Sequence, residues 1–263
     1  MSGGTEVAAS RLETALRGRE EGRVRLVPYL MAGFPDAGAS IELGRTYASA
    51  GAGAIEVGIP FSDPMADGPV IQVAGQAALQ AGMTVGGAMR VAAAVAEEGP
   101  PVVLMTYFNP VLAYGVERFA ADAAAAGVAG VIVPDVPAEE SEGMVGPLHD
   151  AGLDTVFLVA PTSPDERITR ICEVSSGFVY CVTLTGVTGA RSELDPGLQG
   201  LLGRISERSR LPVAAGFGIS TPDHIQRLRG HADAAVVASA LLREVEARRD
   251  PRPLLEELVQ ACR

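Results

Sequence analysis

The chain has 263 residues, a hydrophobic fraction of 48% and a formal net charge of -11. The negative charge argues against a nucleic-acid partner, because binding phosphates along a strand requires basic surfaces. No apolar run reaches the roughly 18 residues of a membrane span, and the N-terminus lacks the basic start and apolar block of a signal peptide. We therefore expect one cytoplasmic domain over residues 1–263, with enough apolar residues for a sizeable core.

Eight short apolar stretches alternate along the chain with alanine-rich stretches of helical spacing. Most of the apolar stretches are continuous, which is typical of parallel strands covered on both faces. The predicted strands are Arg25–Leu30, Ala54–Ile59, Val102–Tyr107, Gly130–Val133, Thr155–Ala160, Phe178–Leu184, Pro212–Ala215 and Ala234–Ala238. The predicted helices between them include Ser40–Ala50, Gly86–Glu98, Val116–Ala126, Glu139–Ala151 and Pro164–Val174.

Repeated strand–helix units predict a parallel sheet of the α/β class. Eight units within this length favour a single closed (β/α)8 TIM barrel over an open, doubly wound sheet. The segment Glu6–Arg17 is predicted to form an extra N-terminal helix, and Pro251–Ala261 a closing helix. In such barrels the chemistry lies at the C-terminal ends of the strands, in the loops that lead to the helices.

The absence of lysine restricts the chemistry that this chain can perform. All 21 basic residues are arginine, so a Schiff-base mechanism is excluded. Three histidines could form a metal site only if all of them took part, and we expect no metal. The cysteines lack CxxC spacing, which argues against a disulfide framework or a zinc site; they are Cys172, Cys181 and Cys262. Most of the mechanisms that remain for breaking a carbon–carbon bond rely on carboxylates and hydroxyls.

A glutamate interrupts the second predicted strand. Glu56 falls on the face that would point into the barrel, whereas Ile55 and Val57 fall on the opposite face. A buried, unpaired carboxylate is costly or has a raised pKa. Glu56 is either a structural residue, in an ion pair or facing the surface, or a general acid and base whose pKa is tuned by burial.

The loop that follows this strand is long for a strand-to-helix connection. Residues 61–69 are rich in turn formers and contain Asp63 and Asp67. Long ordered loops on the active face of a barrel are often functional. Each aspartate could instead form an Asx-turn, since Asp63 precedes a proline and Asp67 precedes a glycine.

Glycines follow the seventh predicted strand, and a serine opens the helix after the eighth. Barrels often hold phosphate between these two loops, at a helix N-terminus. Glycine allows backbone amides to approach an anion, so Gly216 and Gly218 favour a phosphorylated substrate held without a basic side chain. The alternative is an ordinary strand-to-helix turn.

The loop after the sixth predicted strand has the composition of a lid. Gly186 and Gly189 flank Thr188, whose hydroxyl could meet a partner when the lid closes. Tyr180, within the strand, is either a core aromatic or a site residue, and alternation along the strand does not separate the two interpretations.

The segment from Glu56 to Pro69 resembles, almost without a break, the signature of the tryptophan synthase alpha chain family. Further matching segments occur in the family's order and cover essentially the whole chain; they are Tyr29–Gly33, Met105–Pro110, Asp135–Pro137 with Glu139 and Glu140, Gly186–Ala190 and Gly216–Ser220. The resemblance implies a TIM barrel that cleaves indole-3-glycerol phosphate to indole and glyceraldehyde 3-phosphate. This retro-aldol reaction belongs to the last stage of tryptophan biosynthesis.

The resemblance also implies roles for individual residues. Glu56 matches the catalytic glutamate, which exchanges protons with the indole C3 and with the hydroxyl of the substrate side chain. Asp67 matches the aspartate that holds the indole N–H, and Tyr180 matches a tyrosine near Glu56. Tyr107 matches an aromatic residue at the indole end.

The remaining matches concern the lid and the phosphate. Thr188, with Gly189 beside it, matches the lid threonine that bonds the catalytic aspartate on closure. Gly218, Ala238 and Ser239 match the phosphate-binding amides. Alanine at position 238 stands where glycine is commoner in the family; because a backbone amide still binds phosphate there, we expect little effect.

The family implies a partner. Its members form an αββα complex with a beta chain that carries pyridoxal phosphate, and indole passes between the subunits through a tunnel. We expect no cofactor in this chain itself. Asp63 and the segment Asp135–Pro137 would lie on the side that faces the beta chain. Three alternatives are a stand-alone lyase that releases free indole, a different phosphate-binding barrel such as an epimerase or isomerase, and a degenerate subunit that only activates its partner.

Overall fold

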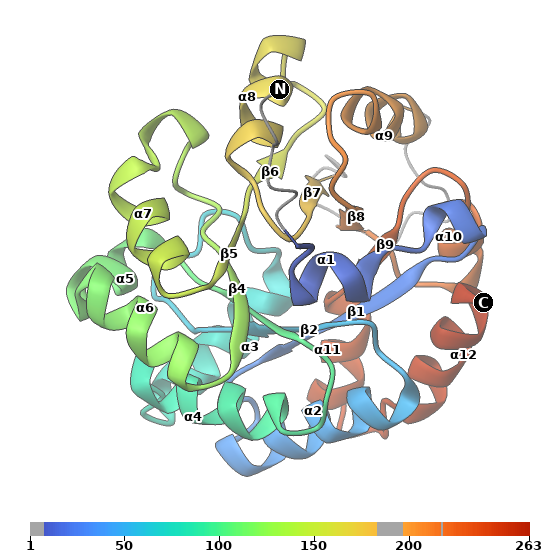
Figure 1. Ribbon diagram of the computed structural model, residues 1–263. Coiled ribbons are helices and arrows are strands. Elements are labelled where there is room, and N and C mark those ends of the chain that lie inside the picture. The colour runs from blue at the N-terminus through green and yellow to red at the C-terminus, as the bar shows by residue number, and fades with distance from the viewer. Residues whose placement is uncertain (1–7, 183–196, 217) are drawn as a thin grey trace.

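The computed structural model describes residues 8–182, 197–216 and 218–263. Within these residues, parallel strands form one nine-stranded sheet in the order β5-β4-β3-β2-β1-β9-β8-β7-β6, with helices around it (Figure 1). The strands are β1 (Arg25–Met31), β2 (Ile55–Gly58), β3 (Val102–Met105), β4 (Val128–Ile132), β5 (Asp154–Val156), β6 (Leu158–Val159), β7 (Val179–Val182), β8 (Val213–Gly216) and β9 (Ala234–Val237). The predicted TIM barrel is confirmed.

The barrel closes through one extended segment. The predicted fifth strand is split at Phe157 into β5, which pairs with β4, and β6, which pairs with β7. The carbonyl of Phe157 itself accepts a hydrogen bond from the amide of Tyr180, at 3.0 Å. Nine strands therefore correspond to the eight predicted units.

Helix α1 precedes the first strand, and the other helices lie between or after the strands and surround the sheet (Figure 1). They are α1 (Arg11–Leu16), α2 (Ala37–Ala50), α3 (Pro69–Gln80), α4 (Val85–Ala96), α5 (Phe108–Tyr114), α6 (Val116–Ala125), α7 (Glu142–Asp150), α8 (Asp165–Val174), α9 (Leu198–Ser206), α10 (Pro222–Gln226), α11 (Ser239–Glu246) and α12 (Arg252–Cys262). Helices α3, α5, α9 and α10 were not among the stretches named from the sequence, and the predicted helix over Glu139–Ala151 begins as a separate 3-10 turn, Ala138–Glu140. In the described part of the chain, no helix is long and apolar enough to cross a membrane.

The extra N-terminal helix closes one end of the barrel. In Figure 1, α1 lies over the strands, and Leu12 and Leu16 on it are fully buried against the barrel interior. The side chain of Ser10 begins the helix by accepting a hydrogen bond from the amide of Glu13, at 3.2 Å. Gly130 on β4 has no Cβ, and a Cβ there would collide with Leu12. This packing leaves the C-terminal ends of the strands for chemistry.

The buried side chains form two layers, as the alternation along the strands predicted. Ile55 and Val57 belong to the layer between the sheet and the helices. Ala54, Tyr29 and Tyr180 belong to the layer inside the barrel. Because Glu56 lies between Ile55 and Val57 on a strand of period two, its side chain points into the barrel.

Asp233 connects the segment before β1 to the starts of β8 and β9. Its carboxylate accepts hydrogen bonds from the amides of Gly18 (3.3 Å), Arg19 (3.0 Å) and Val213 (2.9 Å), and the residue is 5% exposed. Asp233→Ala leaves these buried N–H groups without their acceptor, so we expect the free energy of unfolding to fall by about 3 kcal/mol or more. Urea denaturation measures this loss. Asp150→Ala, at the exposed end of α7, is the control; an equal loss in both variants would contradict the assignment.

Candidate active site

Four strands bring titratable side chains together inside the barrel, towards the C-terminal end. Tyr29 on β1 pairs in register with Glu56 on β2, so the two inward-pointing side chains are neighbours. Tyr107 follows β3, and Tyr180 lies on β7. All four residues are at least 94% buried. Tyr29 was not singled out from the sequence as a site residue; its inward register beside Glu56 is the signal that could have identified it.

Glu56 has the electrostatics of a group that holds a proton at neutral pH. Burial, and then the nearby carboxylate of Asp67, raises the pKa of Glu56 from 4.5 to about 8. Within the described chain, its Oε2 atom is buried without a hydrogen-bond partner, and none of the ion pairs involves Glu56. Glu56 is only 4% exposed, so the surface-facing alternative is wrong, and no described residue supplies the ion pair of the other. The geometry suits a general acid.

Asp67 lies in the long loop after β2 and is held over the barrel mouth. Burial raises its pKa from 3.8 to about 6, while a hydrogen bond from the hydroxyl of Tyr107 acts in the opposite direction. The same hydroxyl accepts a hydrogen bond from the amide of Ala66, at 3.1 Å, and the rings of Tyr107 and Phe61 lie 5.3 Å apart. Tyr107 thus anchors the loop and orients the carboxylate.

Removal of this anchor has a specific expected result. In Tyr107→Phe, Asp67 loses a hydrogen bond that favours its ionised form, so its pKa rises further and the acidic limb of the activity profile moves to higher pH. We expect kcat/KM at neutral pH to fall roughly 10-fold, the effect of one hydrogen bond to a charged group. Steady-state kinetics across the pH range test this. Tyr114→Phe is the matched control, because that hydroxyl bonds Asp122 on the surface; an unmoved acidic limb in Tyr107→Phe would refute the role.

Two tyrosines and two glycines fit together inside the barrel. A Cβ on Gly58 would collide with the hydroxyl and ring of Tyr29, and a Cβ on Gly216 would collide with those of Tyr180. Burial, followed by the carboxyl groups of Glu56 and Asp67, raises the pKa of Tyr180 well above 10. Burial likewise raises the pKa of Tyr29 well above 10, so both hydroxyls stay protonated at neutral pH.

The predicted phosphate end lies where β8 and β9 finish side by side. Gly218 is exposed and has a φ of 81°, a left-handed conformation that favours glycine. Ala238 precedes α11 without any side-chain cap, so the first amides of the helix, beginning with Ser239, are open to an anion. The structure thus brings Gly218, Ala238 and Ser239 to one edge of the barrel, as predicted.

Four further residues singled out from the sequence are not part of the described barrel interior. Thr188 and Gly189 fall outside the described residues, so their expected roles stay predictions. Asp63 is exposed beside Ser62, and Asp135 accepts a hydrogen bond from the amide of Phe108, at 3.0 Å. Neither aspartate contributes to the barrel interior.

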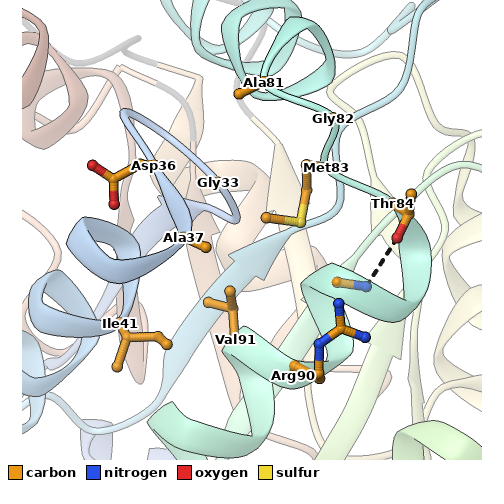
Figure 2. A pocket seen from close by; sticks show the side chains of 11 residues that line it. Gly33, Asp36, Ala37, Ile41, Ala81, Gly82, Met83, Thr84, Arg90 and Val91 are labelled. Atoms are coloured by element: carbon orange, nitrogen blue, oxygen red, sulfur yellow. Dashed lines mark hydrogen bonds between the residues drawn. The ribbon is translucent and has the colours of Figure 1, made fainter.

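A cavity of about 390 Å³ lies outside the barrel, between α2 and α4 (Figure 2). Ile41, Met83 and Val91 line it, with Arg90 at one side. Figure 2 also shows the hydroxyl of Thr84 accepting the hydrogen bond of an α4 amide, at 3.1 Å. The lining of the cavity has one carboxyl group, that of Asp36, so the pair formed by Glu56 and Asp67 makes the barrel mouth the candidate active site.

Comparison with known proteins identifies the family. The sequence profile of the tryptophan synthase alpha chain matches residues 16–263. The chain belongs to the tryptophan synthase alpha chain family. The alpha chain of Roseiflexus castenholzii is 47% identical over 236 residues, which are 89% of this chain and 90% of the relative. The alpha chain of Gluconobacter oxydans is 44% identical over 96% of this chain and 94% of the relative.

Solved structures agree with this membership of the alpha chain family. A tryptophan synthase structure from Mycobacterium tuberculosis superposes with a TM-score of 0.90 at 38% identity and covers 97% of this chain and 99% of that chain. The alpha subunit from Legionella pneumophila gives a TM-score of 0.86 at 32% identity, covering 97% and 99%. An unrelated phosphate-binding barrel is thereby excluded.

Proposed function

We propose that this chain cleaves indole-3-glycerol phosphate to indole and glyceraldehyde 3-phosphate by a retro-aldol reaction. The observation that carries the proposal is the buried carboxyl of Glu56, whose pKa of about 8 keeps it protonated at neutral pH. An acid in this state can begin the reaction without any cofactor. Its position inside the barrel, beside Asp67 and Tyr180, also argues against a subunit that has lost its chemistry.

Glu56 performs both proton transfers in this mechanism. Its carboxylic acid first gives a proton to the indole C3, which converts the ring to an indolenine cation and leaves Glu56 ionised. The carboxylate then takes the proton of the C3′ hydroxyl. The C3–C3′ bond breaks, its electron pair returns to the indole ring, and the aldehyde forms. Protons and electrons balance, and Glu56 is again protonated for the next turnover.

Asp67 stabilises the charge that develops during the first transfer. Its pKa of about 6 leaves it mostly ionised at neutral pH, whereas Glu56 is mostly protonated. The carboxylate of Asp67 can therefore accept a hydrogen bond from the indole N–H as positive charge appears on the ring. Two carboxyl groups whose environments separate their pKa values supply the acid and the anion that the reaction requires.

The phosphate of the substrate binds at the other edge of the mouth. The uncapped start of α11 and the Gly218 turn offer backbone N–H donors to an anion. This arrangement fixes the glycerol phosphate at one side, so that the indole ring reaches Glu56 and Asp67.

A beta chain is the proposed partner, in an αββα assembly. Met65, in the loop after β2, is 91% exposed, and Leu112, on α5, is 57% exposed. The loop after β2 and helix α5 both follow the C-terminal ends of strands, so we expect the beta chain to contact these two side chains. The names of the similar proteins do not favour the alternative of a stand-alone lyase.

Indole release from indole-3-glycerol phosphate, measured with and without a purified beta chain, tests the proposal. We expect slow cleavage by the chain alone and strong acceleration by the beta chain. Full activity that the beta chain leaves unchanged would support the stand-alone lyase instead. No cleavage under either condition would refute the proposed reaction.

A further inference from the structure

A buried histidine lies directly behind the turn at the phosphate end. His224 is on α10, the short helix that follows the Gly218 turn, and is only 2% exposed. Its Nδ1 atom accepts a hydrogen bond from the amide of Ser220, at 3.3 Å. The hydroxyl of Thr221 accepts one from the amide of His224, at 3.4 Å, which fixes the start of α10. The imidazole ring thus ties the end of the turn to the body of the barrel.

The second ring nitrogen of His224, Nε2, makes a histidine a costly choice for this buried position. An Nδ1 atom that accepts a hydrogen bond carries no hydrogen, so the hydrogen of the neutral ring is on Nε2. Nε2 is buried and has no hydrogen-bond partner in the described part of the chain. An unpaired buried donor costs free energy that an apolar side chain of similar volume would avoid. The benefit that the ring provides is therefore the acceptor, Nδ1.

This acceptor determines which amides of the turn remain available. The amide of Ser220 is occupied by His224. In the residues that the structure describes, the amides of Gly218 and Ile219 donate no hydrogen bond. Ile219 is 3% exposed, so burial of its side chain helps to fix the turn. The hydrogen bond to Nδ1 of His224 fixes the backbone that follows. The amides of Gly218 and Ile219 thus have no acceptor in the described part of the chain and can donate to an anion.

We propose that His224 is a positioning residue for the phosphate end of the substrate. It touches neither the phosphate nor the reacting atoms; it holds the turn of Gly218 and Ile219 in the shape that presents their amides. This inference rests on the proposed function, because it assumes that a phosphate ester binds at this turn. It goes beyond that function by assigning part of the substrate affinity to a side chain behind the turn.

Three substitutions of His224 distinguish the effect of the hydrogen-bond acceptor Nδ1 from the effect of the volume of the ring. His224→Asn places an amide oxygen near the position of Nδ1, and His224→Gln places it near that of Nε2. His224→Leu fills the space without any acceptor. We expect KM for indole-3-glycerol phosphate to rise roughly 3- to 10-fold in the Leu and Gln variants, the effect of one hydrogen bond. The Asn variant should stay near the wild type, and kcat should change little in all three.

A substrate without phosphate provides the decisive control. With indole-3-glycerol, kcat/KM should be the same in the wild type and in all His224 variants, because no phosphate reaches the turn. Inhibition by inorganic phosphate should weaken in the Leu and Gln variants in parallel with KM. Thermal unfolding confirms that each variant is folded; if the Leu variant is not, the comparison of Asn with Gln decides.

The outcomes are distinct. A wild-type protein that does not cleave indole-3-glycerol phosphate would overturn the proposed function itself. Normal wild-type cleavage with an unchanged KM in the Gln and Leu variants would overturn the role of His224. An equal loss of kcat/KM on both substrates would also overturn it, because that pattern indicates a purely structural residue.

Discussion

Glu56→Gln is expected to remove turnover and leave binding intact. The amide cannot deliver a proton to the indole C3 or take one from the C3′ hydroxyl, so kcat should fall roughly 10²- to 10⁴-fold, the usual contribution of general acid–base catalysis. Glutamine has the shape of the protonated glutamate that is present at neutral pH. The dissociation constant for indole-3-glycerol phosphate should therefore change little. Single-turnover kinetics and direct titration measure the two quantities separately.

Glu257→Gln provides the matched control for this substitution. Glu257 lies at an exposed position of α12, the last helix of the chain. The same chemical change there should leave kcat unaltered. Substantial cleavage by the Glu56→Gln protein would refute the assignment of both proton transfers. Weak binding by a folded Glu56→Gln protein would instead indicate that the carboxyl serves mainly to hold the substrate.

The buried carboxyl of Glu56 should also make the protein less stable as the pH rises. In the unfolded chain this group ionises near pH 4.5, whereas in the folded protein it keeps its proton until about pH 8. Between these values the folded state binds the additional proton, so the free energy of unfolding falls with increasing pH. Over the whole interval the loss from this one group is on the order of 5 kcal/mol.

Urea denaturation at a series of pH values tests this linkage. The Glu56→Gln protein cannot lose the proton, so its free energy of unfolding should exceed that of the wild type increasingly from about pH 4.5 to pH 8. Below this interval the difference should be small and constant. Parallel curves for the two proteins over the whole interval would show that Glu56 titrates normally, and would remove the basis for its role as an acid.

Much of this architecture follows from local patterns along the chain. The near-continuous apolar strands and the helices between them predicted the barrel, because each unit shows its own periodicity. The period of two placed Glu56 inside the barrel beside Ala54. The glycine after the seventh strand and the serine after the eighth predicted the phosphate end, because neighbouring parallel strands finish at the same edge of the sheet.

Other features depend on contacts between distant segments, and no local pattern contains them. The hydroxyl of Tyr107 meets Ala66 and Asp67 across the mouth, a contact set by how the loop after β2 folds back. The split of the fifth strand at Phe157 arises because its two halves pair with different neighbours when the barrel closes. The unpaired nitrogen of His224 likewise becomes evident only once the ring is buried.

The phosphate end built from the Gly218 turn and the start of α11 has a consequence for how fast substrate arrives. The sequence from 213 to 226 and from 234 to 242 contains no arginine or lysine, and the chain as a whole carries a net charge of -11. Backbone dipoles attract an anion only at short range, so the long-range field repels a doubly charged phosphate ester. Added salt screens that repulsion. The association rate should therefore rise with ionic strength, the reverse of the behaviour of enzymes that steer phosphate with a ring of cations.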